Sequence, residues 1–441
     1  MPLDHRSIAL PYADSFAALA PKLPGAALPW VNDLRSRSAA RFARSGLPTQ
    51  RVERWKYTSL NGLAATQFAM PSGQHGAVAA PGRAAAILPD SYRLVFVNGD
   101  LRRDLSSPGA PPLGVHLLGL AEALAQNPEL VRLHLAQADG MDDALSLLNL
   151  AFMSDGIVVR IDPDAALETP LELSHIGSPG DQPLAFHGRN WIVAGAGSRA
   201  TIIESFAGEA AYWVNQATQI TLAERAEIRH YKSQADSSRA FHIASANVRV
   251  ARESRYESFV LSTGAGMSRN EINVTLDGEG ASCLLGGGYL MRGRQHVDTT
   301  TEIIHAQPRT TSKEIYKGVL DDQSRGVFQG RIVVQPNAQK SDGHQLSKTI
   351  LLSDRAEIDT KPELEIYADD VKCSHGATAG ELDDDALFYL RARGIDTAEA
   401  RRMLVAAFVG DAIENISHEA VRTVFAGQAQ QWMATEGARA S

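Results

Sequence analysis

The spacing of apolar residues divides this chain of 441 residues into a helical beginning, a β-rich middle and a helical end. Before residue 70, apolar side chains recur at helical intervals, as in 30–44, and predict amphipathic helices. From about residue 156 the pattern changes to short β-branched runs that Gly, Asp or Ser residues separate. We therefore expect an N-terminal helical domain over 1–70, a connecting segment over 71–155, a β core over 156–378 and a C-terminal helical domain over 379–441.

The β-rich runs recur at a regular distance. Neighbouring turns lie roughly 26 to 30 residues apart, a repeat length typical of solenoids. The tetrapeptide Arg-Ala-Glu-Ile occurs twice, at 225–228 and 355–358. Several short strands also fit a sandwich or a barrel. We favour a parallel β-helix with helical caps, in which each coil stacks its strands on the previous coil.

The segments on either side of the core carry local signals. Residues 71–89 are rich in Gly, Ala and Pro and predict a loop or linker. The apolar run at 94–97 leads into Asn98-Gly99, which is a hairpin signal, and residues 116–152 have helical spacing. After the core, Asp383 and Asp396 stand at the start of two apolar helical runs, as N-caps do. The apolar surface of these helices either caps the solenoid or docks a partner.

Composition narrows the class of protein. The formal charge of −8 argues against a general nucleic-acid binder, which needs a basic face. The two cysteines, Cys283 and Cys373, exclude a disulfide framework and fit a reducing compartment. The first residues lack the pattern of a signal peptide, and no apolar run is long enough for a membrane span. We expect a soluble cytoplasmic protein of two or three units.

The candidate chemistry lies near the end of the core. Cys373 and His375 are two residues apart on an expected strand and therefore point the same way. A thiolate beside an imidazole suits a soft metal, or a nucleophile with its base. On this chemistry alone, a buried Cys and a hydrogen-bonded His with only a structural role are slightly favoured, because a free Cys is commonly a small buried apolar residue. Gly376 and Gly380 are expected to end the extended run.

The same region resembles a known family. Residues 341–378, Ser-Asp-Gly-His-Gln-Leu-Ser-Lys-Thr-Ile-Leu-Leu-Ser-Asp-Arg-Ala-Glu-Ile-Asp-Thr-Lys-Pro-Glu-Leu-Glu-Ile-Tyr-Ala-Asp-Asp-Val-Lys-Cys-Ser-His-Gly-Ala-Thr, are similar to the SufB/SufD family of iron–sulfur cluster assembly proteins. A weaker likeness continues upstream to Gln-Gly-Arg-Ile at 329–332 and downstream to Leu-Val-Ala-Ala-Phe at 404–408. Gly-Leu-Pro-Thr-Gln-Arg-Val-Glu-Arg-Trp-Lys-Tyr-Thr at 46–58 resembles the SufD branch, and the shortage of cysteines agrees with that branch.

The resemblance implies a scaffold and not a stand-alone enzyme. It implies a right-handed parallel β-helix between helical parts, paired with SufB through the β-helix. It also implies a SufC-type ABC ATPase on the C-terminal helical domain, whose ATP-driven closure reshapes the SufB interface. A homodimer is the alternative for the isolated chain. The family's Cys-x-His pattern falls on His375, the first expected ligand of a transient iron–sulfur cluster or iron, and on Cys373, the second.

The chain alone has too few ligands for a cluster. Iron–sulfur clusters usually take four thiolates, with His as an attested replacement. Cys283 belongs to a different coil and fits a small core residue. The missing ligands must come from a partner subunit, from carboxylates such as Glu363 or Glu365, or from solvent. We therefore expect Cys373 and His375 at a subunit interface, and no tightly bound cofactor in the isolated chain.

Two other functions fit parts of the sequence. A β-helix enzyme acting on polysaccharide could use the acidic residues 369–370 or 383–385. A mononuclear zinc protein could use Cys373, His375 and His344 as three ligands of an open site.

No glycine-rich phosphate-binding motif ending in Lys-Ser/Thr is present, so an ATPase activity must lie in another chain.

Overall fold

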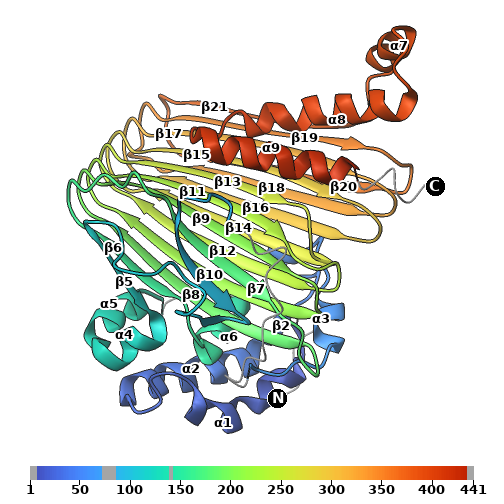
Figure 1. Cartoon of the computed structure of the whole chain (residues 1–441). Coiled ribbons are helices and arrows are strands. Elements are labelled where there is room, and N and C mark those ends of the chain that lie inside the picture. The colour runs from blue at the N-terminus through green and yellow to red at the C-terminus, as the bar shows by residue number, and fades with distance from the viewer. Residues whose placement is uncertain (1–6, 72–85, 139–142, 435–441) are drawn as a thin grey trace.

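A parallel β-helix made of two facing sheets forms the centre of the molecule (Figure 1). The computed structural model describes residues 7–71, 86–138 and 143–434. Consecutive strands alternate between the sheets, so each coil adds one strand to each. One sheet, called the even sheet, contains β6 (Ile157–Ile161), β8 (Leu184–Ala194), β10 (Tyr212–Leu222), β12 (Phe241–Val250), β14 (Met267–Leu276), β16 (His296–His305), β18 (Arg325–Val334) and β20 (Glu357–Ile366). The odd sheet contains β7 (Leu171–Gly177), β9 (Arg199–Gly208), β11 (Glu227–Ala235), β13 (Arg255–Ser262), β15 (Ser282–Met291), β17 (Thr311–Leu320), β19 (Asp342–Leu351) and β21 (Lys372–Gly380).

In-register aliphatic ladders hold the coils together. On the inner face of the even sheet one ladder runs through seven strands: Ile192, Ile220, Val248, Val274, Ile303, Ile332 and Leu364. The first six are at most 2% exposed. Such stacking removes apolar side chains from water coil by coil, as in other solenoids. The parallel β-helix predicted from the repeat length is therefore confirmed.

The repeated tetrapeptide marks one step of the coil. Ala226 and Ala356 are buried at corners, and the next residues, Glu227 and Glu357, begin β11 and β20. Arg225, at the first of these corners, has a φ of 57°, which lies in the left-handed region. Both copies of the tetrapeptide therefore lie where the chain turns from one sheet into the other.

Strands before residue 156 also join the two sheets. β3 (Tyr92–Val97) turns through Asn98 and Gly99, both with positive φ, into β4 (Asp100–Leu101), which confirms the predicted hairpin. β3 pairs in parallel with β7, and β5 (Val115–Gly119) pairs antiparallel with β6. The expectation of helix from residue 116 was therefore wrong over β5, because pairing with β6 overrides its helical spacing. Helices follow directly: α4 (Leu120–Gln126), α5 (Pro128–Ala138) and α6 (Ala144–Phe152).

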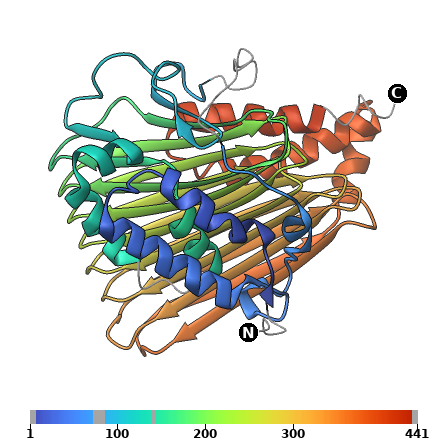
Figure 2. The same ribbon diagram turned by 90° about the horizontal axis from the view of Figure 1, so that it is seen from below.

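Helices flank the β-helix on both sides (Figure 2). The N-terminal elements are β1 (Ser7–Ile8), η1 (Pro11–Ser15), α1 (Phe16–Leu19), η2 (Ala20–Lys22), α2 (Pro29–Ser45), β2 (Leu47–Pro48), η3 (Glu53–Trp55) and α3 (Asn61–Ala65). With α6 they form an apolar cluster against the even sheet, where Phe152 and Leu148 meet Trp213 of β10. None of the described helices is both long and apolar enough to cross a bilayer.

The C-terminal helices cover the odd sheet. α8 (Thr397–Ile413) and α9 (Glu419–Ala434) pack Val409 and Phe425 against Phe259, Leu261 and Leu290. α7 (Asp384–Ala392) packs on α8 and projects away from the sheets (Figure 1). The predicted caps are confirmed, since the side chains of the two aspartates preceding α7 and α8 accept the backbone N–H of the third residue of their helices.

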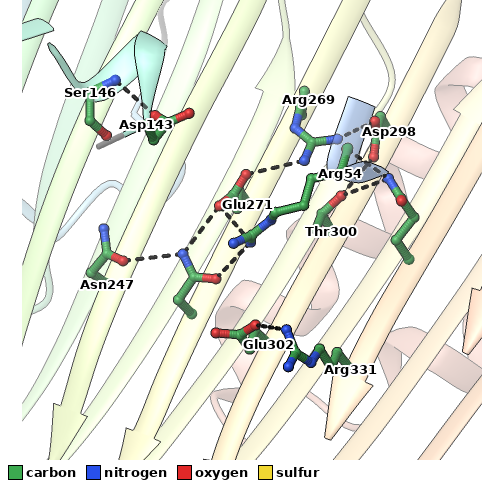
Figure 3. A network of polar contacts seen from close by, with 12 residues as sticks. Arg54, Asp143, Ser146, Asn247, Arg269, Glu271, Asp298, Thr300, Glu302 and Arg331 are labelled. Atoms are coloured by element: carbon green, nitrogen blue, oxygen red, sulfur yellow. Dashed lines mark hydrogen bonds and ion pairs between the residues drawn. The ribbon is translucent and has the colours of Figure 1, made fainter. Parts of the chain in front are cut away.

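Residues 53–58, here called the N-terminal strap, contact the outer face of the even sheet, where Figure 3 shows Arg54 beside Glu271. Trp55 is 5% exposed and lies 4.2 Å from the guanidinium of Arg269, and Thr58 Oγ1 donates to Asp298 Oδ2 at 2.5 Å. Arg54 donates to Glu271 at 2.7 Å. Trp55 therefore packs its ring against the outer face of the sheet. A recess of about 360 Å³ beside the strap is lined by the same ion pairs and by Asn amides.

The strap is fastened to a fully buried ion pair between Arg269 and Asp298. Replacing Asp298 with Asn leaves the Arg269 guanidinium buried with a weakened counter-charge, and we expect a loss of about 3 kcal/mol in the free energy of unfolding. The matched control is Asp277→Asn, which breaks an exposed Arg–Asp pair with Arg249 between neighbouring coils. That change should cost about 1 kcal/mol or less. Urea titration of both variants measures the difference, and equal losses would contradict the prediction.

Candidate functional site

The last coil of the β-helix is open. β20 pairs only with β18 and β21 only with β19, so each strand has one free edge. No residue of β20 or β21 is fully buried, whereas most residues of β18 are. Leu364 and Cys373 pack against Ile332, Val334 and Ala338 of the preceding coil and remain partly exposed on the other side. The interior of the solenoid is therefore accessible at this end.

Cys373 and His375 both lie on β21, at this open end. Cys373 pairs in register with Gly343 and His375 with Gln345. Because Cys373 packs against the inner core, the alternation of the strand directs His375 to the inner face as well. The strand does not end at Gly376 as expected but continues to Gly380. Pairing with β19, which places Gly376 opposite Leu346, overrides the turn tendency of glycine here.

The two candidate ligands differ in exposure and charge. Cys373 is partly buried, and this burial raises the pKa of its thiol, while the backbone N–H of Gly343 acts in the opposite direction. The thiol is therefore protonated at neutral pH and must lose its proton to bind a metal. His375 is exposed. No hydrogen bond between Cys373 and His375 occurs in the described part of the chain, so the geometry does not favour a nucleophile paired with its base.

The register separates the other predicted ligands from this pair. His344 lies opposite Ser374 on the outer face of the odd sheet, where its Nδ1 is 2.6 Å from Ser374 Oγ. It also contacts Asp342 through Nε2 at 2.7 Å. The three side chains of the zinc alternative are therefore not brought together, because Cys373 and His375 face inward and His344 faces outward.

The carboxylates of β20 also point away from the pair. Glu363 and Glu365 alternate with the inward Leu364 and so lie on the outer face of the even sheet. Lys361 contacts Glu363 at 3.3 Å, and Arg331 contacts Glu365 at 2.8 Å. The hydrogen bond from Arg331 lowers the pKa of Glu365. Within residues 7–71, 86–138 and 143–434, no three His, Cys, Asp or Glu residues are grouped to hold a metal ion.

The remaining predicted residues have structural surroundings. Cys283 faces the interior from β15 and is 5% exposed, which confirms it as a core residue. Burial raises the pKa of its thiol well above the ordinary value. Asp383, which we considered for polysaccharide chemistry, caps α7. Cys373 and His375 are thus the two candidate ligands that share the inner face of β21.

Two buried polar residues behind His375 escaped the sequence analysis. Glu314 of β17 and Gln345 of β19 are 1% and 3% exposed, and Gln345 Nε2 donates to Glu314 Oε2 at 2.6 Å. Burial raises the pKa of Glu314 to about 7. Glu314 lies two residues before Tyr316, an inward aromatic residue of the same strand, and residues two apart on a strand share a face. This spacing was the available signal that Glu314 faces inward. The alignment of Glu314 with Gln345 and His375 depends on the register between coils, which the sequence alone does not show.

The fold and its open end define a class of protein, a β-helix scaffold with two free strand edges, and comparison with known proteins gives the family. Residues 176–408 match the family described as SUF system FeS cluster assembly, SufBD core domain. Residues 7–173 match the SufBD protein N-terminal region. The chain belongs to the SufB/SufD family of iron–sulfur cluster assembly proteins.

Relatives from three kinds of organism agree with this assignment. An iron–sulfur cluster assembly SufBD family protein of Synechocystis is 32% identical over 84% of this chain and 84% of its own. The iron–sulfur cluster assembly protein SufD of Escherichia coli is 31% identical over 86% of this chain and 88% of its own. The chloroplastic protein ABCI7 of Arabidopsis thaliana is 28% identical over 90% and 85%. The resemblance that rests on residues 341–378 is therefore confirmed over most of the chain.

The buried carboxyl of Glu314 makes stability depend on pH. The unfolded chain ionises Glu314 near 4.5, while the folded chain keeps it protonated up to about 7, so its ionisation opposes folding as pH rises between these values. We expect Glu314→Gln to be nearly neutral at pH 4 and to stabilise the protein by about 3 kcal/mol at pH 8. Urea titrations across this range measure the difference. Glu302→Gln, at a partly exposed glutamate paired with Arg331, is the control and should show no such stabilising rise with pH.

Proposed function

We propose that this chain is a scaffold subunit that contributes part of a coordination sphere to a nascent iron–sulfur cluster or its iron, carried as cargo. The observation that carries the proposal is the open last coil, with Cys373 and His375 as the candidate soft-metal ligands on its inner face. A cluster needs about four ligands, so a second chain must supply the others. The chain is then not a stand-alone enzyme. Its two free thiols fit the reducing cytoplasm, where we place this activity.

The two ligands have different roles in this proposal. His375 is exposed at the edge and can bind iron through a neutral imidazole nitrogen. Cys373 must first lose a proton that its burial retains, so iron binding and thiol deprotonation are coupled. We therefore assign His375 as the first ligand and Cys373 as the second.

The second chain docks at the same end. β20 and β21 present unpaired backbone groups, and a chain with a similar solenoid end can continue both sheets by strand addition. Ile366, the last residue of β20, and Tyr367, which follows it, are 43% and 61% exposed and supply apolar area beside that edge. SufB is the sibling that we propose here. A second copy of this chain takes its place when the chain is isolated.

An ABC ATPase of the SufC type docks on the C-terminal helices in our proposal. Phe388 and Tyr389 of α7 are 73% and 57% exposed, and Met403 of α8 is 42% exposed. Large apolar side chains grouped on a projecting helix are typical of a docking surface. Since α8 and α9 pack on the odd sheet, motion of a bound ATPase would be transmitted to this sheet, whose last strand is β21.

Replacing His375 with Ala in the complex with the SufB sibling and the ATPase should lower the yield of assembled cluster at least tenfold, because the first ligand is lost. Visible absorption and iron and sulfide content of the purified complex measure the yield. His344→Ala is the matched control, since it removes an imidazole from the outer face one strand away. A His375→Ala complex with the yield of the original protein would remove the proposed role.

Replacing Phe388 with Ser should weaken capture of the ATPase at least tenfold, because one buried aromatic contact at an interface is worth about 1.5 kcal/mol or more. Binding of the purified ATPase measured by calorimetry checks this. Leu113→Ser, at a fully exposed leucine before β5, is the control and should leave capture unchanged. Equal affinities for Phe388→Ser and the original chain would exclude α7 as the docking surface.

A further inference from the structure

A polar column runs through the last three coils of the odd sheet. Glu314, Gln345 and His375 occupy in-register positions on β17, β19 and β21, and all three belong to the inward-facing set of their strands. Neighbouring strands lie about 4.8 Å apart, so each side chain is the direct neighbour of the next. Burial decreases along the column, from Glu314 and Gln345, which are buried, to His375, which is exposed.

Gln345 is held in one orientation within this column. Its Nε2 donates to Glu314 Oε2 at 2.6 Å, so the amide oxygen points away from this carboxyl oxygen. Gly330 of β18, on the facing sheet, leaves room for the amide, because a Cβ atom there would lie 1.9 Å from Nε2. The interior is therefore shaped for a long amide side chain at this position.

This orientation leaves an acceptor without a partner. Gln345 Oε1 is buried and accepts no hydrogen bond in the described part of the chain. A buried acceptor without a donor costs about 1–3 kcal/mol, and such groups commonly have a role. The next residue of the column is His375, and its imidazole ring carries an N–H group of the kind that this acceptor needs.

We propose that Gln345 is a positioning residue for His375, and this inference rests on the proposed function of His375 as a ligand. A metal-bound histidine usually donates its second ring N–H to an acceptor, which sets its tautomer and the direction of its lone pair. Gln345 Oε1 supplies that acceptor when the exposed His375 ring turns inward. Glu314 anchors the Gln345 amide so that the oxygen faces the open end.

The test uses the assembled complex with variants at Gln345. Gln345→Met keeps length and volume but removes the acceptor, and we expect a tenfold or greater loss of cluster yield. Gln329→Met is the matched control, since Gln329 is a buried glutamine on the outer face of β18, away from the column. It should leave the yield unchanged.

A charge-conserving swap separates positioning from packing. In the double variant Glu314→Gln with Gln345→Glu, the amide and the carboxylate exchange places, so an acceptor for His375 is restored at position 345. We expect the swap to recover most of the cluster yield that Gln345→Met loses. The thermal unfolding midpoint of each isolated chain is measured in parallel. If Gln345→Met does not fold, the swap alone decides, and full yield supports the proposal.

The outcomes distinguish this inference from the function on which it rests. Normal yield in Gln345→Met, together with low yield in His375→Ala, overturns the role of Gln345 and keeps the proposed function. Low yield in the swap with an unchanged unfolding midpoint also overturns it. Normal yield in His375→Ala means that the proposed function itself has failed.

Discussion

Parallel pairing between consecutive coils is the constraint on which the rest of the structure depends. Each strand between the first and the last coil forms backbone hydrogen bonds with a strand of the coil before it and a strand of the coil after it. The same pairing stacks Ile303 on Val274 and Ile332 on Ile303, and so builds the core. The last coil has no successor. Its two strands therefore keep free edges, and its inner side chains lack a cover.

The open end and the candidate ligands are consequences of the same geometry. Register with the preceding coil turns Cys373 and His375 toward the interior and turns His344 and Glu365 outward. Cys373 and His375 lie on a strand with one free edge, and we propose that another chain binds beside them. This arrangement is consistent with membership of a family of iron–sulfur cluster assembly proteins.

Specific polar contacts lie near the open end, both on the outer face of the even sheet and inside the β-helix. On the outer face of the even sheet, Lys361 of β20 contacts Glu53 of the N-terminal strap at 2.5 Å, so the first residues of the chain reach the last coil. Inside, Gln345 and Glu314 bring polar groups close to the aliphatic and aromatic side chains of the core. Buried polar groups cost desolvation free energy unless they are paired, and the hydrogen bond between Gln345 Nε2 and Glu314 Oε2 offsets part of that cost, whereas Gln345 Oε1 has no partner among the described residues.

The sequence by itself determined the elements that local chemistry controls. Repeat length indicated the β-helix, Asn98-Gly99 marked the hairpin, Asp383 and Asp396 marked helix starts, and a long motif marked the family. These signals are read within one coil or one helix. Alternation along a single strand likewise placed Cys373 and His375 on one face.

Only the tertiary structure decided which side chains of different coils meet. Glu314 and Gln345 are 31 residues apart, whereas His344 and Ser374 are 30 apart, yet both pairs are direct neighbours. The number of residues in each corner sets the register, and a slip of one residue would exchange the inner and outer faces of a strand. Corner lengths vary without a clear sequence signal. For this physical reason the zinc trio looked possible in the sequence, and the column behind His375 was visible only in the fold.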